Sequence, residues 1–326
     1  MTIKLADLEI SPPVLLAPMA GITDLPFRRL VARFGAGLVV SEMVASQEMV
    51  QAKPGVRERA ALGLDADGTA VQLAGRDPHW LAEAARMVEA NGARLIDFNM
   101  GCPAKKVVNG WSGSALMRDP DNAVRLVQAV VSAVSVPVTV KMRLGWDDES
   151  RNAAAIARRL ADTGVRMIVV HGRTRAQFYK GRADWAAIGE VVDAVSLPVI
   201  ANGDIVDVPS ARKALELSGA AGVMVGRGAQ GRPWLLAGIA HALFGAPSVR
   251  VPAGGELLDM IATHYEDMLS FYGKALGMRV ARKHLGWYLD DLGAPKALRR
   301  AVLTGTEPRQ VMADMDRAIR GERLVA

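Results

Sequence analysis

The stretch Leu95-Ile96-Asp97-Phe98-Asn99-Met100-Gly101-Cys102-Pro103 is an apolar run that stops at Gly-Cys-Pro. Such a run is typical of a buried strand in a parallel sheet, because both faces of that strand are covered. Cys102 is the only cysteine of the chain, so it forms no intrachain disulfide and cannot build a structural zinc site by itself. It is either a thiol that packs as a small apolar residue or a group that does chemistry. Its place at a strand end favours chemistry.

Seven further short apolar runs accompany this one, and amphipathic helical patterns separate the later runs. The expected strands cover residues 14–16, 38–41, 70–73, 95–99, 136–141, 167–171, 197–202 and 222–226. The expected helices cover residues 80–90, 123–134, 152–162, 185–194 and 210–217. Alternation of strands and helices indicates an α/β fold with a parallel sheet covered by helices. Eight units in roughly 230 residues predict a (β/α)8 TIM barrel, and an open doubly wound sheet is the alternative.

The last quarter of the chain has a different character. Residues 247–255 are rich in Ala, Pro and Gly, which is typical of a linker, and no β-rich run follows them. Helical patterns cover residues 257–271, 279–289, 295–301 and 308–320. We therefore expect two domains, a barrel in residues 1–245 and a small all-helical domain in residues 246–326.

Composition narrows the class of protein. The 326-residue chain is 50% hydrophobic and has a formal net charge of +6, which permits a nucleic-acid partner without requiring one. A single cysteine favours a location in the reducing cytoplasm. The first residues carry charges where a signal peptide would be apolar, so we expect no signal peptide. No uncharged apolar run reaches the length of a membrane span, so we expect no membrane partner. The five histidines include no metal-like pair, so we expect no metal, and no serine-hydrolase elbow or P-loop is present.

Polar residues or glycine turns follow nearly every expected strand. The carboxyl ends of barrel strands meet at one face, where barrel enzymes build their active sites. Each of these residues alone has a structural explanation, but their coincidence at successive strand ends favours a site. They are Gln72, Asn99, Cys102, Lys141, Arg143, His171, Asn202 and Arg227.

The last two strand ends favour a phosphate site. A turn at Gly203 follows the seventh strand, and Gly226-Arg227-Gly228 follows the eighth. Barrels commonly bind phosphate at these two positions, where glycines allow backbone N–H groups to approach the oxygens and an arginine adds charge. Lys141 and His171, one strand apart, are suited to hydrogen-bond a bound ring system.

Several blocks together resemble the tRNA-dihydrouridine synthases, and the similarity covers essentially the whole chain. One departure is Trp111-Ser112, where the resemblance predicts a small or aliphatic residue before Gly-Ser-Ala-Leu. Two further blocks, Ala104-Lys105-Lys106-Val107 and Arg282-Lys283-His284-Leu285-Gly286-Trp287-Tyr288, resemble the bacterial B-type branch. The family blocks are Ala17-Pro18-Met19-Ala20-Gly21-Ile22-Thr23-Asp24, Asn99-Met100-Gly101-Cys102-Pro103, Val140-Lys141-Met142-Arg143, His171-Gly172-Arg173-Thr174-Arg175 and Asn202-Gly203-Asp204.

The resemblance implies an FMN-binding barrel that reduces a uridine in the D-loop of tRNA to 5,6-dihydrouridine, with NADPH as reductant. It implies that Cys102 gives the proton to C5 while reduced FMN gives a hydride to C6; a thiol is mostly protonated at neutral pH. It implies that Pro18, Met19, Ala20 and Gln72 hold the isoalloxazine ring. It also implies that Lys141 and His171 contact the flavin and its ribityl region. The residues implied to line the ribityl-phosphate end of the cofactor are Asn202, Gly203, Asp204, Gly226 and Arg227.

The resemblance also implies that the helical domain binds tRNA, and monomeric action is compatible with a tRNA that contacts both domains. Residues 279–300 hold six Lys or Arg against two acids, with aromatic residues between them. Trp287 and Tyr288 have an alternative role as core of the small domain. The expected RNA contacts are Arg173, Arg175, Arg282, Lys283, His284 and Trp287.

Two other functions are compatible with parts of the sequence. The first is an FMN barrel that acts on a free pyrimidine. The basic helical tail argues against this function. The second is a non-catalytic RNA-binding regulator. The intact strand-end residues argue against this function.

Overall fold

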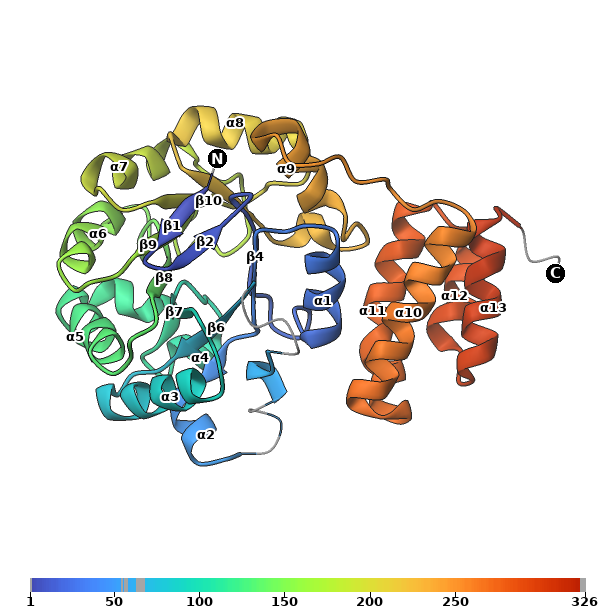
Figure 1. The fold of residues 1–326 in the computed structure, drawn as a ribbon, viewed down its shortest axis with the longest axis horizontal. Helices are drawn as coiled ribbons and strands as arrows, with labels where there is room; N and C mark the ends of the chain where they lie inside the picture. Colours follow the sequence, from blue (N-terminus) through green and yellow to red (C-terminus); the bar gives the residue numbers. More distant parts are fainter. Residues whose placement is uncertain (1, 54, 56–57, 63–67, 323–326) are drawn as a thin grey trace.

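The structure is a computed structural model that describes residues 2–53, 55, 58–62 and 68–322. Figure 1 shows a ring of strands surrounded by helices, with a separate helical bundle at one side. Each strand of the ring pairs in parallel with its neighbours, and β4 also pairs with β6, which closes the sheet. This closure confirms the TIM barrel over the open sheet. The eight strands are β3 (Val14–Leu16), β4 (Leu38–Val40), β6 (Thr69–Ala74), β7 (Ile96–Met100), β8 (Val138–Arg143), β9 (Met167–His171), β10 (Val199–Asn202) and β11 (Gly222–Val225).

An N-terminal hairpin closes one end of the barrel, and the sequence analysis did not predict it. Strands β1 (Ile3–Leu5) and β2 (Leu8–Ile10) pair antiparallel, and their apolar residues are buried. These residues pack against side chains that include Leu15, Met167 and Met224. Because the hairpin fills the amino-terminal end of the barrel, the carboxyl-terminal end is the one left for a site.

Helices cover the outside of the ring, and the five predicted barrel helices are present with ends that differ by a few residues. Aspartates at positions 24, 77, 119 and 207 cap four of the barrel helices through their side chains. A short strand, β5 (Val44–Ala45), extends the pairing of β6. The helices are α1 (Leu25–Arg33), α2 (Ser46–Val50), α3 (Pro78–Ala90), α4 (Lys105–Val108), α5 (Pro120–Val131), α6 (Ala153–Ala161), α7 (Ala186–Ala194), α8 (Val208–Ser218) and α9 (Leu235–Phe244), with 3-10 turns η1 (Glu58–Ala60), η2 (Gly113–Arg118) and η3 (Arg227–Ala229).

All four helical patterns of the tail are helices, and the expected division at residue 245 falls just after α9. They are α10 (Gly255–Tyr272), α11 (Lys274–Asp291), α12 (Lys296–Thr304) and α13 (Pro308–Ile319). Their apolar faces share a core of their own that includes Ile261, Leu289 and Met315. Within the described residues, no helix is long and apolar enough to cross a membrane.

The tail docks on α1 and on the loop that precedes it. The Phe27 ring of α1 lies 5.8 Å from the His264 ring and 5.1 Å from the His284 ring, measured between centroids. The Tyr272 hydroxyl donates a hydrogen bond of 3.0 Å to the Asp24 carboxylate. The Lys283 ammonium donates to the Gly21 carbonyl. The tail therefore contacts the loop between β3 and α1, which the sequence analysis assigned to cofactor binding.

Candidate active site

The strand register brings the polar strand ends together at the carboxyl-terminal end of the barrel. Asn99 stands beside Lys141, and His171 stands between Arg143 and Asn202 in the ladder. The site is therefore assembled from four successive strands, as the sequence predicted.

A buried carboxylate organises the first part of the site. Asp97 accepts hydrogen bonds of 2.7 Å from the Gln72 amide and of 2.7 Å from the Thr139 hydroxyl. The Gln72 amide oxygen in turn accepts from the Asn99 amide at 2.7 Å. Burial raises the pKa of Asp97 to about 6, although its two hydrogen bonds act in the opposite direction. This network fixes the Gln72 amide and leaves one of its N–H hydrogens for a ligand.

The backbone of Cys102 is fixed from both sides, and its side chain is half-buried. The Asn99 side-chain oxygen accepts from the Cys102 N–H at 3.0 Å, and Ser114 donates to the Cys102 carbonyl from its N–H at 3.0 Å and its hydroxyl at 2.9 Å. Gly113 has a φ of +60°, and a Cβ there would lie 2.8 Å from the Cys102 carbonyl oxygen. The loop therefore needs glycine at this position to hold the thiol in place.

Lys141 brings a positive charge into the site next to Asn202. The Lys141 ammonium donates a 3.0 Å hydrogen bond to the Asn202 side-chain oxygen, and the Asn202 amide donates to the Met224 carbonyl at 2.8 Å. Burial, followed by the charge of Arg143, lowers the pKa of Lys141 to about 8. In the described part of the chain the ammonium has this one hydrogen-bond acceptor, so two of its hydrogens are available to a ligand.

His171 is held neutral by its surroundings. It is buried, and an Arg173 nitrogen lies 3.3 Å from its Nε2 atom. Burial, followed by the charges of Lys141, Arg143 and other cations, lowers the pKa of His171 well below its ordinary value. Because the guanidinium is a donor only, Nε2 accepts and the ring proton is on Nδ1. His171 is therefore a hydrogen-bonding group and not an acid at neutral pH.

Arg173, an expected RNA contact, is buried in this structure and hydrogen-bonded within the protein. Its side chain is 1% exposed and donates to both Asp204 carboxylate oxygens, at 2.9 Å and 2.5 Å. It also donates to the carbonyls of Lys180 at 3.0 Å and Gly181 at 2.8 Å. With His171 these acceptors occupy every N–H of the guanidinium, so Arg173 fixes the loops after β9 and β10 and offers nothing to a ligand.

The other expected RNA contacts divide into buried and accessible residues. His284 is buried against Phe27 and His264, at the interface between the barrel and the tail. Lys283 points at the barrel and not at solvent, because it is bonded to the Gly21 carbonyl. Arg282 is exposed, while Arg175 and Trp287 are half-buried.

The loops after β10 and β11 form the other end of the site. Gly203 has a φ of +115°, and a Cβ there would lie 2.8 Å from a ring carbon of His171. A Cβ on Gly228 would lie 2.5 Å from the Ile205 carbonyl oxygen, so these two loops pack backbone against backbone. Beside them the Arg227 side chain is 56% exposed and lies 3.5 Å from the Asp204 carboxylate. The glycines therefore leave this end of the site lined by backbone, with one accessible guanidinium.

The loop with Pro18, Met19 and Ala20 lies against the same end. The Ala17 N–H donates to the Val225 carbonyl at 2.8 Å, and the Met19 N–H donates to the Thr23 hydroxyl at 2.9 Å. A Cβ on Gly226 would lie 3.8 Å from the Met19 sulfur. The structure therefore brings this loop and the Gly226 turn together, as the predicted cofactor site requires.

Three residues of the site, Arg143, Tyr179 and Asp97, were not assigned a role from the sequence. Arg143 is buried and donates to the carbonyls of Gly101 at 2.8 Å, Thr174 at 2.9 Å and Phe178 at 3.0 Å, so it ties the Cys102 loop to the loop after β9. The Tyr179 ring lies under the guanidinium groups of Arg227, at 5.0 Å, and Arg143, at 5.7 Å. Asp97 was detectable as a charge inside an apolar strand; Tyr179 sits in an irregular loop that carries no periodic signal.

The fold and this site define an α/β-barrel enzyme whose functional groups converge at the carboxyl ends of its strands. Residues 15–322 match the family model described as Dihydrouridine synthase (Dus). The chain therefore belongs to the dihydrouridine synthase family.

Known relatives support this membership over nearly the whole chain. The chain is 63% identical over 314 residues to a probable tRNA-dihydrouridine synthase of Rhodobacter capsulatus, which covers 96% of each protein. It is 46% identical to tRNA-dihydrouridine synthase B of Xanthomonas campestris, over 95% of this chain and 93% of that protein. Among solved structures it is similar in fold to histamine dehydrogenase from Rhizobium sp. 4-9, with a TM-score of 0.56 and 13% identity, over 81% of this chain and 50% of that one.

Proposed function

We propose that this enzyme reduces the C5–C6 bond of a uridine in the D-loop of tRNA to give 5,6-dihydrouridine, with bound FMN and with NADPH as reductant. The observation that carries the proposal is the Cys102 loop, held at the mouth of the barrel beside Lys141 and His171 in a member of the dihydrouridine synthase family. The tRNA substrate follows from the names of the relatives, which are tRNA-dihydrouridine synthases.

The residues of the site fit a flavin mononucleotide. Gln72 and Lys141 each keep hydrogen-bond donors for the acceptor atoms of a ring, and the loop of Pro18–Ala20 lies on the same side. The Gly203 and Gly226 turns with Arg227 fit the ribityl chain and phosphate, because close-packed backbone and one exposed guanidinium suit an anion. When bound, FMN supplies the hydride for C6 of the uridine.

Cys102 gives the proton to C5 in this proposal. The uridine double bond becomes a single bond as C6 gains a hydride and C5 gains the thiol proton, which leaves a thiolate. The neighbouring charges of Lys141 and Arg143 stabilise that thiolate until solvent protonates it again. His171 is neutral, so it orients ligands through Nδ1–H and does not compete as the acid.

The RNA reaches this site by extruding the uridine from its stack. Arg282 of α11 is exposed, and Arg175 at the barrel mouth lies 4.6 Å from the centre of the Trp146 ring. We propose Arg282, Arg175 and the accessible part of Trp287 as contacts for the tRNA backbone and bases.

The test uses purified enzyme, NADPH and tRNA from a host that lacks dihydrouridine, with mass spectrometry and position mapping. Wild type should form dihydrouridine at one D-loop position. Cys102→Ala should keep yellow flavin and NADPH oxidation but lose most of the product. Turnover of tRNA by Cys102→Ala at the wild-type rate would exclude Cys102 as the acid. Reduction of free pyrimidine but not of tRNA would favour the small-molecule alternative, and a colourless protein without product would favour the regulator.

A further inference from the structure

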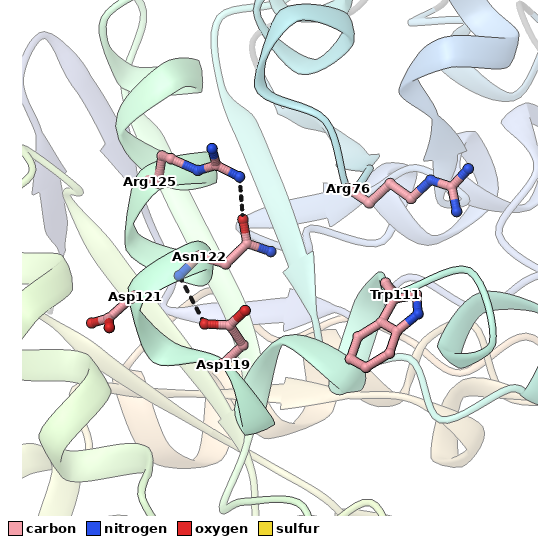
Figure 2. Close-up of a pocket in the computed structure, with 6 residues that line it drawn as sticks. All are labelled: Arg76, Trp111, Asp119, Asp121, Asn122 and Arg125. Atoms are coloured by element: carbon pink, nitrogen blue, oxygen red, sulfur yellow. Dashed lines mark hydrogen bonds between the residues drawn. The ribbon is translucent and has the colours of Figure 1, made fainter.

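An exposed tryptophan lines a hollow at the rim of the barrel. The hollow has a volume of about 550 Å³ and is formed by the loop after β6, the loop before η2 and the start of α5. Figure 2 shows its lining residues, Arg76, Trp111, Asp119, Asp121, Asn122 and Arg125. The Trp111 side chain is 58% exposed, more than any other exposed large hydrophobic residue in the described part of the chain. Large exposed aromatic residues of this kind are typical of binding surfaces.

The loop holds Trp111 in a rigid but unfavourable conformation. Trp111 has a φ of +55°, which non-glycine residues adopt at a cost. Backbone hydrogen bonds keep it there: the Trp111 N–H donates to the Val108 carbonyl at 3.0 Å, and the Ser112 N–H donates to the Val107 carbonyl at 3.3 Å. The indole is therefore presented to solvent by a structured turn, which lowers the entropy cost of stacking a ligand on it.

Arginines extend this aromatic surface toward the active site. The Arg118 guanidinium lies 5.9 Å from the Trp111 ring centre and 4.8 Å from the Trp146 ring centre, and Arg175 covers Trp146 at 4.6 Å. Ser114, three residues after Trp111, is bonded to the Cys102 carbonyl. Three residues span at most about 11 Å, so the turn lies close to the Cys102 loop.

The charge of the hollow suits a nucleic acid. Arg76, on the β6 side, and Arg125, on α5, are exposed cations. The two carboxylates of the hollow have partners: Asp119 caps α5 by accepting from the Asn122 N–H at 3.2 Å, and Asp121 pairs with Arg159 at 2.7 Å. Arg125 donates a 2.8 Å hydrogen bond to the Asn122 side-chain oxygen and keeps further N–H groups. Its guanidinium, that of Arg76 and the aromatic face of Trp111 therefore suit the phosphates and bases of single-stranded RNA.

We infer that this hollow is a second RNA-contact surface, in which an unpaired base of the tRNA stacks on Trp111 while Arg76 and Arg125 contact phosphates. In Figure 1, α3 and α4 lie along the lower edge of the barrel and α5 at its left, whereas α10–α13 lie to the right of the barrel. A tRNA that contacts both the tail and the hollow would therefore span the barrel between them. The inference rests on the proposed tRNA substrate and adds the surface that orients it.

The test compares Trp111→Leu with wild type in the flavin-loaded, full-length enzyme. Leucine is also an L residue, so the backbone cost at this position is unchanged. The dissociation constant for unmodified tRNA should rise by about 5- to 150-fold, the range expected for loss of one stacked base. The rate at saturating tRNA and the NADPH oxidation rate should stay at wild-type values. Binding of tRNA should quench the fluorescence of wild type more than that of Trp111→Leu.

Charge variants give an independent readout. Arg76→Ala and Arg125→Ala should each reduce the slope of log affinity against log salt by about one, whereas Arg86→Ala, a control on the outer face of α3, should not. Unchanged tRNA affinity in Trp111→Leu would overturn the inference. A higher KM for NADPH with unchanged tRNA affinity would overturn it too, and would indicate a dinucleotide site. In either case the wild-type product assay still tests the proposed function.

Discussion

Arg282 and Lys283 are neighbours on α11, yet the structure gives them different roles, which paired variants can separate. Successive residues of a helix point about 100° apart. Arg282 is exposed to solvent, whereas the Lys283 ammonium is bonded to the Gly21 carbonyl. The Glu42 carboxylate accepts from the Gly21 N–H. Burial lowers the pKa of Lys283, and the charges of Asp24 and Glu42 partly oppose this shift. Lys283 therefore bonds across the barrel–tail interface, and we expect it to contribute to stability and not to RNA binding.

The size of the effect of Lys283→Met follows from these contacts. A hydrogen bond to a charged group contributes about 1.5–3 kcal/mol, and partial exposure of the ammonium screens some of this. We expect a loss of about 1–2 kcal/mol in the free energy of unfolding, or a melting temperature lower by roughly 1.5–3 °C for a chain of this length. The affinity for tRNA should stay within about twofold of wild type, since no RNA contact is removed.

Arg282→Met should show the opposite pattern. The melting temperature should be unchanged, because the side chain is exposed, while tRNA affinity falls and its log–log salt slope decreases by about one. Fluorescence anisotropy with labelled tRNA at several salt concentrations, together with thermal unfolding, measures both quantities. The reasoning is refuted if Lys283→Met lowers the salt slope and leaves the melting temperature unchanged, because Lys283 would then be an RNA contact.

Two further predictions concern the barrel and its interface with the tail. Gly203→Ala places a methyl group 2.8 Å from the His171 ring at a φ of +115°, so we expect a strain of about 1–3 kcal/mol. The variant should lose flavin on desalting, which visible absorbance measures. Full retention of the flavin would contradict this prediction. Burial lowers the pKa of His264 to about 3, so below pH 6.5 the unfolded state binds more protons than the folded state. The stability that the neutral His264 contributes is therefore present above pH 6.5 and is lost as the pH falls toward 3. The free energy of unfolding of wild type relative to His264→Phe should therefore fall by about 2 kcal/mol between pH 7 and pH 5, and equal pH slopes for the two proteins would contradict this.

The sequence located the barrel strands well for a physical reason. The strands are covered on both faces, so each is a continuous apolar run that ends sharply at a polar residue or glycine, as in Met167–His171. The closed ring makes all of these ends meet, so the candidate site followed from the fold. The hairpin at Ile3–Leu5 was missed because its strands are three residues long, too short for an alternating pattern.

The roles of the arginines were less accessible to sequence reasoning. Arg173 and Arg175 are two residues apart in one motif, and a basic pair is equally compatible with RNA binding and with burial. Only the tertiary structure brings Asp204 and two loop carbonyls to Arg173, which satisfies and buries it. The same holds for His284, which depends on where α11 docks against Phe27.

The sequence by itself determined the barrel, the helical tail, the family and the strand-end residues around Cys102, because local apolar patterns and short motifs encode them. The tertiary structure decided which polar side chains are free to act. Buried charged groups such as Arg143 and Arg173 are hydrogen-bonded by partners from other segments of the chain, and no local pattern records those partners. It also decided that Trp111, one residue in the loop that follows Cys102, is exposed at the rim of the barrel.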